Sequence, residues 1–391
     1  MRITQNMMFR IANEAIRRNA IKLIKSQEQI STGKRINKPS DDPVDTGDIL
    51  NLRTSISKTN QFLSNDDRAT SILSSMDSAL QLLSGLIIRA KSLTVQAAND
   101  AVMSPENKIQ LAIDLTGMLQ ELIEVANTQY MDQYIFSGNK IRTQTLTPLG
   151  IQTNALPGNS GNAEITATDI KDMTKYTFDN YTITFTSPPV PPSYTVTNQR
   201  TGEVIATGTY TSGAEIVFDG FSVTISDLVG SPQNGDSFEV ITDNVGTYQG
   251  DTNSMNIEID DELMVDITLT GDRIFKGVGG GTDIIQSFVD LIRALRQNDI
   301  DEINEGLANL DNSQEQILDF LSVAGAKQNE VNNISEKLKD LLIVQKSVLS
   351  KIEDADMIEA SSEFAKDQFA FQTTLKANAQ ILQQSLLDYL K

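Results

Sequence analysis

Carboxylates are the residues of this chain with the greatest capacity for chemistry. The 391-residue sequence has 52 Asp plus Glu against 32 Lys plus Arg, and it contains no Cys, His or Trp. These absences exclude a disulfide, a Cys or His zinc site, a Cys nucleophile and a Ser-His-Asp triad. Carboxylates could still act as acids or bases, or bind calcium or magnesium.

Two acidic groups are candidates for a cation site. The first group lacks the EF-hand spacing D-x-[DN]-x-[DN]-G, so we interpret it as a solvated acidic loop or strand edge. The second group precedes a proline at the start of an expected helix, so helix capping explains it better. The two groups are Asp260, Asp261, Glu262 and Asp266, and Asp41 with Asp42.

A glycine run before an expected helix resembles a phosphate-binding nest. It lacks the G-x-x-x-x-G-K-[ST] pattern, and the next basic residue is Arg293, so we interpret it as a flexible loop. The run consists of Gly277, Gly279, Gly280 and Gly281. No carboxylate pair stands out by its spacing. The sequence therefore predicts no enzyme activity, no metal and no cofactor.

The start of the chain is basic. Residues 1–40 contain nine Lys plus Arg and two Glu, a net charge of +7, whereas the remaining chain carries −27. This segment could bind nucleic acid or an anionic membrane, but Phe9 is its only aromatic residue, so we favour the polar face of an assembly helix and expect neither partner. Basic residues interrupt 1–30, and no run of about 18 apolar residues occurs, so neither an ordinary signal peptide nor a membrane span is expected.

Composition divides the chain into helical flanks and a different middle. Residues 146–284 hold 16 of the 23 glycines, 7 of the 10 prolines and 11 of the 22 Phe plus Tyr. We expect a mainly α protein with a β insertion: a long coiled-coil-like helical stem built from both chain ends, and a small antiparallel β outer domain. The expected divisions are 1–42 with 352–391 as a terminal helical pair, 43–145 with 282–351 as a helical bundle stem, and 146–281 as the β domain.

The expected stem has an apolar residue every three or four positions. From Ile303 to Ile352 this pattern is unbroken, which favours coiled-coil packing. A few polar members should weaken the contact and fix its register; they are Gln314, Gln328, Ser335 and Gln345. Helix starts are expected at Ser40-Asp41-Asp42-Pro43, at Ser104-Pro105, at Thr282 or Asp283, and at Asp299 or Asp301.

Both ends of the chain carry narrow apolar stripes. Isolated amphipathic helices are marginal in water, so both ends should need a partner: each other, neighbouring subunits, or both. We therefore expect an exposed assembly interface, which consists of Phe9, Ile16, Leu23 and Ile30 near the start and Leu375, Ala379, Leu382, Leu386 and Tyr389 near the end.

The middle of the chain is predicted to form strands, because aromatic or branched residues alternate there with Thr. The expected strands cover 176–178, 181–185, 194–197, 203–210, 215–218, 221–225 and 238–241. Asp219-Gly220 between two of them indicates a two-residue hairpin. Residues 146–284 carry a net charge of −14, so this domain should face solvent.

The stretch QISTGKRINKPSDDP over 29–43 resembles the N-terminal signature of the bacterial flagellin family. Residues 1–4 and the IEDAD of 352–356 resemble the family's two termini. YIFSGNK (134–140), GDSF (235–238) and SLLDYL (385–390) resemble hook-associated proteins of the hook–filament junction, type 3, more than filament flagellin. The signature residues are Gly33, Arg35, Ile36, Asn37, Asp41, Asp42, Pro43, Phe136, Ser137 and Gly138.

This resemblance implies a structural adaptor that is exported unfolded by the flagellar type III apparatus with a cytoplasmic chaperone. It implies an extracellular ring layer between hook and filament, in contact with the other hook-associated junction protein on one side and flagellin on the other. Terminal helices would be disordered in the free monomer and fold on assembly. A filament-forming flagellin is the alternative, and a carboxylate hydrolase on the β domain is a third class that no residue pair supports.

Overall fold

The computed structural model describes residues 5–99, 103–187, 191–227, 230–261 and 263–389. The chain forms two compact units. The terminal unit combines Met1–Asn65 with Asn333–Lys391, and the central unit is Asp66–Asn332. Two long helices contribute to both units, so the boundaries fall inside helices rather than in the linkers that the sequence suggested.

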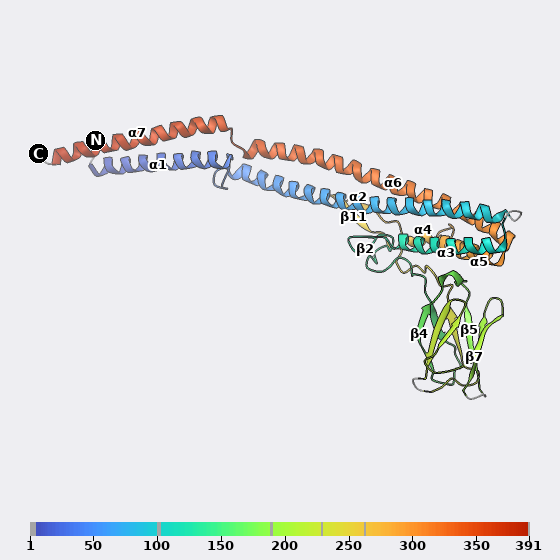
Figure 1. Cartoon of the computed structure of the whole chain (residues 1–391). Helices are drawn as coiled ribbons and strands as arrows, with labels where there is room; N and C mark the ends of the chain where they lie inside the picture. Colours follow the sequence, from blue (N-terminus) through green and yellow to red (C-terminus); the bar gives the residue numbers. More distant parts are fainter. Residues whose placement is uncertain (1–4, 100–102, 188–190, 228–229, 262, 390–391) are drawn as a thin grey trace. The chain divides into compact units, whose positions relative to one another are not determined.

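Seven α-helices dominate the described residues (Figure 1). They are α1 (Gln5–Thr32), α2 (Pro43–Ala98), α3 (Pro105–Ala126), α4 (Gly271–Phe275), α5 (Ile284–Gln297), α6 (Ile300–Glu353) and α7 (Met357–Tyr389). The expected start signals are confirmed: Ser104 accepts from Asn107 N, and Asp283 accepts from Gln286 N. Of the two candidates at α6, Asp299 is the cap, because its carboxylate accepts from the next helix amides.

The helical core lies in the central unit, where α3 packs against α5. It buries one face each of α2, α3, α5 and α6, including Leu73, Leu80, Leu83, Ile87, Leu115, Leu119, Phe288, Leu291, Ile303, Leu310 and Ile317. Among the described residues, α2 alone is long and apolar enough to cross a bilayer, and 44% of that window is buried in the protein. The sequence reasoning missed this window because polar residues interrupt it; a core helix passes the same test.

Two of the polar residues predicted in the long helices, Gln328 and Gln345, bond across to α2. In the terminal unit, Gln345 Nε2 donates to Ser55 Oγ at 2.9 Å and its Oε1 accepts from Thr59 Oγ1 at 3.2 Å. In the central unit, Gln328 Nε2 donates to Ser74 Oγ at 3.0 Å. Each bond forms only when the two helices are in one register, because a slip of one turn would leave the amide without its partner.

The β domain contains two antiparallel sheets. One has the order β3 (Gln152–Ala155), β10 (Ser237–Ile241), β5 (Tyr181–Thr186), β6 (Ser193–Asn198), β7 (Val204–Thr209). The other has the order β4 (Glu164–Ile170), β9 (Phe221–Ser226), β8 (Glu215–Phe218). Two hairpins, β1 (Gln129–Tyr130) with β2 (Gln133–Tyr134) and β11 (Asn256–Asp260) with β12 (Leu263–Asp266), complete the strands of the described chain.

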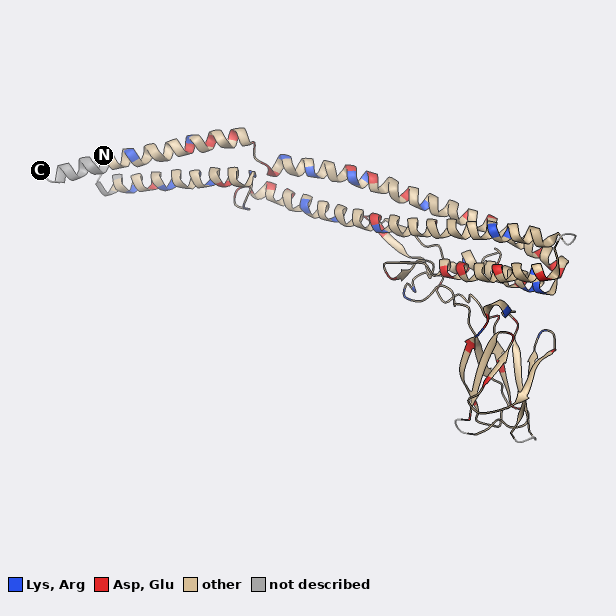
Figure 2. Ribbon diagram, in the orientation of Figure 1, with Lys and Arg blue, Asp and Glu red and all other residues tan. Residues whose placement is uncertain are grey.

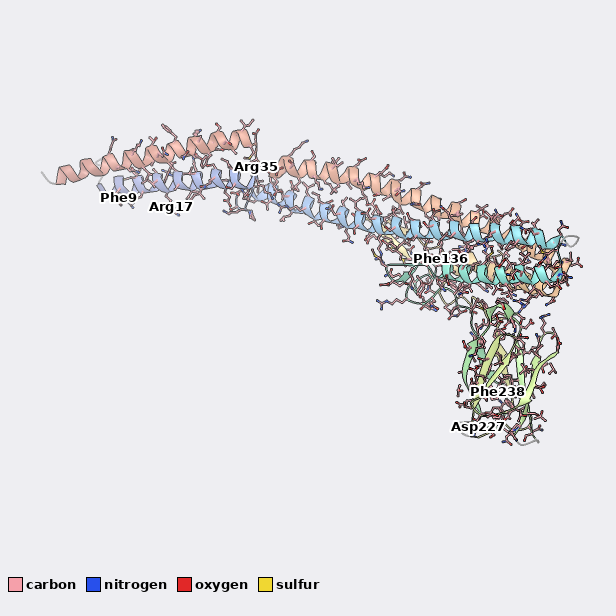
Figure 3. The ribbon with its side chains drawn as sticks, viewed as in Figure 1. Phe9, Arg17, Arg35, Phe136, Asp227 and Phe238 are labelled. Atoms are coloured by element: carbon pink, nitrogen blue, oxygen red, sulfur yellow. The ribbon has the colours of Figure 1, made fainter. Side chains whose placement is uncertain are left out.

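Alternation along the strands fills the domain with rings. Tyr181, Ile183 and Phe185 of β5 are buried while the threonines between them are partly exposed. Phe185 packs edge-on against Phe238, with ring centroids 6.0 Å apart. Figure 3 labels Phe238 among the strands and Asp227 at the end of the domain. The period-two pattern therefore positions the aromatic core.

Two expectations about this domain need comment. The hairpin at Asp219-Gly220 is confirmed, since both residues have positive φ and Phe218 pairs with Phe221. The strand expected at 176–178 is wrong: these residues follow a short 3₁₀ helix at Met173–Lys175, and Phe178 has φ of 57°. A left-handed residue interrupts a strand, so Tyr176 and Phe178 reach the core from a loop. The exposed strand β4 gave no hydrophobic signal and was missed.

Candidate assembly interface

The helices α1 and α7 lie against each other within the terminal unit (Figure 1). Asn378 Nδ2 donates to Ala12 O at 3.1 Å, Asn19 Nδ2 donates to Thr374 Oγ1 at 2.6 Å, and Ser26 Oγ donates to Asp367 Oδ2 at 3.1 Å. As the numbers on α1 rise, those on α7 fall, so the helices are antiparallel. The contact between them, which we call the α1–α7 seam, therefore includes polar pairs along its length.

The apolar stripe predicted on α1 lies largely in this seam. Ile16, Leu23 and Ile30 are three or four residues from Asn19 and Ser26, which places them on the same face, and all three are half-buried. Phe9, labelled in Figure 3, is 52% exposed. On α7, Leu375 and Ala379 are exposed, whereas the side chains of Leu382, Leu386 and Tyr389 lie outside the described part. Ile16, Leu23 and Ile30 are therefore partly covered by α7 of the same chain and are not free for contact with another subunit.

Sequence reasoning missed the polar members of the seam and an outward apolar face. On α1 the exposed apolar residues include Ile21 and Ile24, and on α7 they include Ile358 at 85% and Phe369 at 72%. Ile358 and Phe369 are 11 residues apart, three helical turns, so they share a face turned away from the seam. Exposed basic residues lie along α1 (Figure 2), among them Arg17, which Figure 3 labels.

Two connections meet where α1 leads into α2 and where α6 leads into α7. We call these two connections, residues 33–42 and 353–356, the joint. Many of the signature residues lie in it. Gly33 has φ of 70° and its N–H donates to Gln29 O, which ends α1 in a left-handed cap. Its carbonyl accepts from Ala355 N at 2.9 Å. Lys34 and Asp354 form a β-bridge beside it. The two connections are therefore hydrogen-bonded to each other.

Arg35, labelled in Figure 3, binds to both α6 and α2 at the joint. Arg35 Nη2 donates to Ile352 O at 2.9 Å and pairs with Asp45 at 2.5 Å. Ile36 is buried, and Asn37 Nδ2 donates to Lys34 O at 3.1 Å. These signature residues hold one chain segment onto another, which explains the residue types without any ligand.

Of the two signature carboxylates, Asp42 caps α2 as expected, whereas Asp41 accepts from amides of the loop that precedes it. Asp41 Oδ2 accepts from the amides of Asn37 and Lys38, and Oδ1 pairs with Lys25 at 3.2 Å. Burial alone would raise the pKa of Asp41, but these bonds hold that pKa below its ordinary value. Asp42 Oδ1 accepts from Val44 N at 3.2 Å, and Pro43 is the first residue of α2. Within the described ranges, no cluster of acidic residues could hold a metal.

A further carboxylate in the joint was assigned no role by sequence reasoning. Glu353 is the last residue of α6 and only 4% exposed. Its Oε1 accepts from Lys34 Nζ and from Arg53 Nη2, both at 2.5 Å. An acidic residue at a helix C-terminus is unfavourable because the helix dipole is negative there. This unfavourable position could have indicated from the sequence that Glu353 has specific partners.

The remaining signature residues lie in the central unit and support its fold. Phe136 is fully buried and packs edge-on against Phe275, with ring centroids 5.5 Å apart. Ser137 Oγ donates to Tyr134 O and Lys140 O. Gly138 has φ of 65°, and a Cβ there would collide with Asp251. This turn therefore requires glycine.

The other chemical candidates have structural roles. Asp260 and Asp266 belong to the β11–β12 hairpin, Asp261 lies in its turn, and Glu262 lies outside the described residues. The glycine loop before α5 is held by Gln316, whose Oε1 accepts from Thr282 N at 2.7 Å and whose Nε2 donates to Ile274 O at 2.8 Å. A side chain thus satisfies the amide that a phosphate would need.

Family models match both helical flanks of the chain. The bacterial flagellin N-terminal helical region matches residues 3–141, and the bacterial flagellin C-terminal helical region matches residues 301–390, together more than half of the sequence. The chain belongs to the bacterial flagellin family. It is therefore a structural protein of the bacterial flagellum and not an enzyme.

Relatives within the flagellin family include both junction and filament proteins. Flagellar hook-associated protein 3 of Salmonella typhimurium is 33% identical over 141 residues, 36% of this chain and 44% of that protein. Its Escherichia coli counterpart is 31% identical over 144 residues, 37% of this chain and 45% of that protein. A flagellin of Clostridium tyrobutyricum is 22% identical over 98% of this chain and 99% of its own length. The match thus spans less than half the length of either hook-associated relative.

A solved structure supports the fold. A Vibrio parahaemolyticus protein described as a flagellar hook-associated protein aligns with 80% of this chain and 100% of its own, with a TM-score of 0.52 and 14% sequence identity. Helical flanks around an inserted β domain are thus shared by flagellin-family proteins of very different sequence.

Proposed function

We propose that this flagellin-family protein is the adaptor that forms a ring layer between hook and filament. The observation that carries the proposal is the identity of 33% and 31% to two hook-associated proteins 3. The motifs at 134–140 and 235–238 favour the same branch. As a junction protein it would contact the other hook-associated protein on the hook side and flagellin on the distal side.

The proposed assembly surface includes the outward face of the α1–α7 pair. Exposed residues such as Ile24, Ile358 and Phe369 have no cover within the terminal unit. Burying them between subunits would contribute roughly 25 cal/mol for each Å² of apolar surface. Phe9, Leu375 and Ala379 are exposed and would join this surface, whereas Ile16, Leu23 and Ile30 would stabilise it by holding α1 on α7.

We extend the proposal to the route by which the protein reaches this place. Membership of the flagellin family supports export through the flagellar type III apparatus, with a cytoplasmic chaperone covering the apolar faces. The protein would then be extracellular, with the long helices α2 and α6 packed as a coiled coil. Single amphipathic helices such as α1 and α7 are marginal in water, which fits helices that are disordered before assembly.

A filament-forming flagellin is the second candidate, and the alignment with the Clostridium flagellin along nearly the whole chain favours it. Purified protein seeded with filament fragments distinguishes the two. A junction adaptor should add a short layer and stop, whereas a flagellin should grow long filaments. Long seeded filaments would overturn the adaptor proposal.

Assembly itself can be tested in cells that lack this gene. Complementation with the wild type should restore attached filaments, and Ile24→Asp with Phe369→Asp should not, because a charge on each outward face cannot be buried without a partner. Val217→Asp is the matched control, since Val217 is an exposed apolar residue of the β domain. Attached filaments in the double variant would remove these residues from the interface.

A further inference from the structure

Glu353 occupies a position that disfavours a carboxylate. It is the last residue of α6, where the carbonyl ends of the helix carry partial negative charge. Its side chain is 5% exposed, so most of its hydration is lost. A negative charge survives at such a place only where specific partners offset both effects.

The partners of Glu353 come from two segments of the chain, the 33–42 loop and α2. Lys34 belongs to the 33–42 loop and Arg53 to α2, and both bind the same carboxylate oxygen. The backbone carbonyl of Glu353 accepts from Arg35 N at 2.7 Å. The elements that meet here carry several charged groups besides Glu353. They are Lys34, Arg35, Lys38, Asp41 and Asp42 in the loop, Asp45, Asp48 and Arg53 in the first turns of α2, Lys351 of α6, and Asp354 and Asp356 in the link to α7.

The two cations differ from Glu353 in their exposure. The side chains of Lys34 and Arg53 are 41% and 49% exposed, so water can solvate them when the carboxylate is absent. The carboxylate has no such alternative. The ion pairs therefore constrain the position of Glu353 more than they stabilise the cations, and removing its charge should loosen the joint without leaving a buried unpaired charge.

We propose that Glu353 is the positioning residue of the joint: its carboxylate holds the 33–42 loop and α2 against the end of α6, and so fixes the direction in which α1 and α7 leave the joint. The geometry is independent of the proposed function. Its consequence, that the helical pair is presented in one orientation for assembly, rests on that function.

Hydrogen–deuterium exchange of the full chain tests the inference. Peptides that contain Arg35 and Ala355 report the two backbone bonds between the connections. We expect Glu353→Gln to speed their exchange by roughly tenfold or more, the effect of losing charge-assisted hydrogen bonds. Glu359→Gln, at an exposed site in the first turn of α7, should leave the exchange unchanged. Equal exchange in the two variants would overturn the proposal.

A pH profile separates positioning by charge from simple packing. Burial alone would raise the pKa of Glu353, but the bonds from Lys34 and Arg53 hold it below the ordinary value of 4.5. A depressed pKa contributes stability above the ordinary value that is lost as pH falls through the folded-state pKa. The protection lost in Glu353→Gln should therefore be present in the wild type above pH 4.5 and vanish in more acidic solution. A wild-type advantage that persists unchanged in acid would contradict the assignment.

Arg53→Gln gives an independent check. It should reproduce part of the faster exchange, and it should add little in a chain that already carries Glu353→Gln, because both changes remove the same bond. Fully additive effects would count against a shared role. These outcomes do not depend on whether the protein acts at the junction or in the filament, since neither measurement requires assembly.

Discussion

Ser26 and Asp367 meet across the α1–α7 seam, where Ser26 Oγ donates a 3.1 Å hydrogen bond to Asp367 Oδ2 although 341 positions separate them. Asn19 with Thr374 and Asn378 with Ala12 make similar contacts along the same line. Polar contacts thus give the seam a defined register, beside the half-buried Ile16, Leu23 and Ile30. Such a pair can form reversibly, which suits helices that fold when they meet their neighbours.

The Ser26–Asp367 bond should contribute about 1 kcal/mol to the stability of the pair. A double-mutant cycle with Ser26→Ala and Asp367→Ala, followed by chemical denaturation monitored by circular dichroism, measures this coupling. Ser26 Oγ has one hydrogen, which it can also donate to Lys22 O, so each single substitution should cost no more than about 1 kcal/mol. A coupling indistinguishable from zero would mean that the contact does not set the register.

Gln345 should fix the register of α2 against α6 without adding to the free energy of unfolding. It is nearly buried between Ser55 and Thr59, and Gln345→Leu should leave the free energy of unfolding unchanged or slightly higher because an apolar residue replaces a polar one in the contact. The variant should also populate several associated states, measured by light scattering after size exclusion, because the register bond is gone. Gln61→Leu, at an exposed position of α2, should remain homogeneous.

Asp179 makes the β domain sensitive to acid. It is 4% exposed and bonds to Arg200 through two nitrogens, at 2.6 and 3.0 Å, and to Asn198. Burial alone would raise the pKa of Asp179, but these bonds hold it below its ordinary value of 3.8. Its contribution is therefore present above pH 3.8 and lost as pH falls through the lowered pKa.

We accordingly expect Asp179→Asn to destabilise the β domain by about 2–4 kcal/mol near neutral pH, with the difference from wild type disappearing in acid. Tyrosine fluorescence reports this unfolding, since the chain has 8 Tyr and no Trp. Asp169→Asn is the control, because Asp169 is an exposed partner of Lys171. A pH-independent loss would assign the effect to packing instead.

Two glycines should respond oppositely to alanine. Gly138→Ala places a methyl group against Asp251 at a positive φ and should destabilise the central unit by roughly 2 kcal/mol or more. Gly85→Ala, in the middle of α2 with open space around it, should stabilise the chain by about 0.5–1 kcal/mol. Thermal unfolding of both variants checks the contrast, and a fall in Tm for Gly85→Ala would contradict it.

The sequence by itself determined the long helices, the strands β5 to β10 and the helix caps, but not the short strands β1, β2, β3, β11 and β12. Apolar periodicity located the long helices because a helix must bury one face, and Ser104, Asp283 and Asp299 marked starts because free amides need acceptors. Strand β4 and the loop at Tyr176–Phe178 escaped, since a mostly exposed strand has no apolar signal and a left-handed residue is fixed by its surroundings. Features that depend on neighbouring residues, such as helix periodicity and caps, could therefore be predicted from the sequence alone.

Only the tertiary structure decided which surfaces are already covered. The stripe of Ile16, Leu23 and Ile30 was readable, but its half-burial against α7 depends on residues more than three hundred positions away. The same holds for Glu353, whose partners Lys34 and Arg53 are distant in sequence. Periodicity reports that a face must be buried, whereas the partner that buries it is a property of the folded chain.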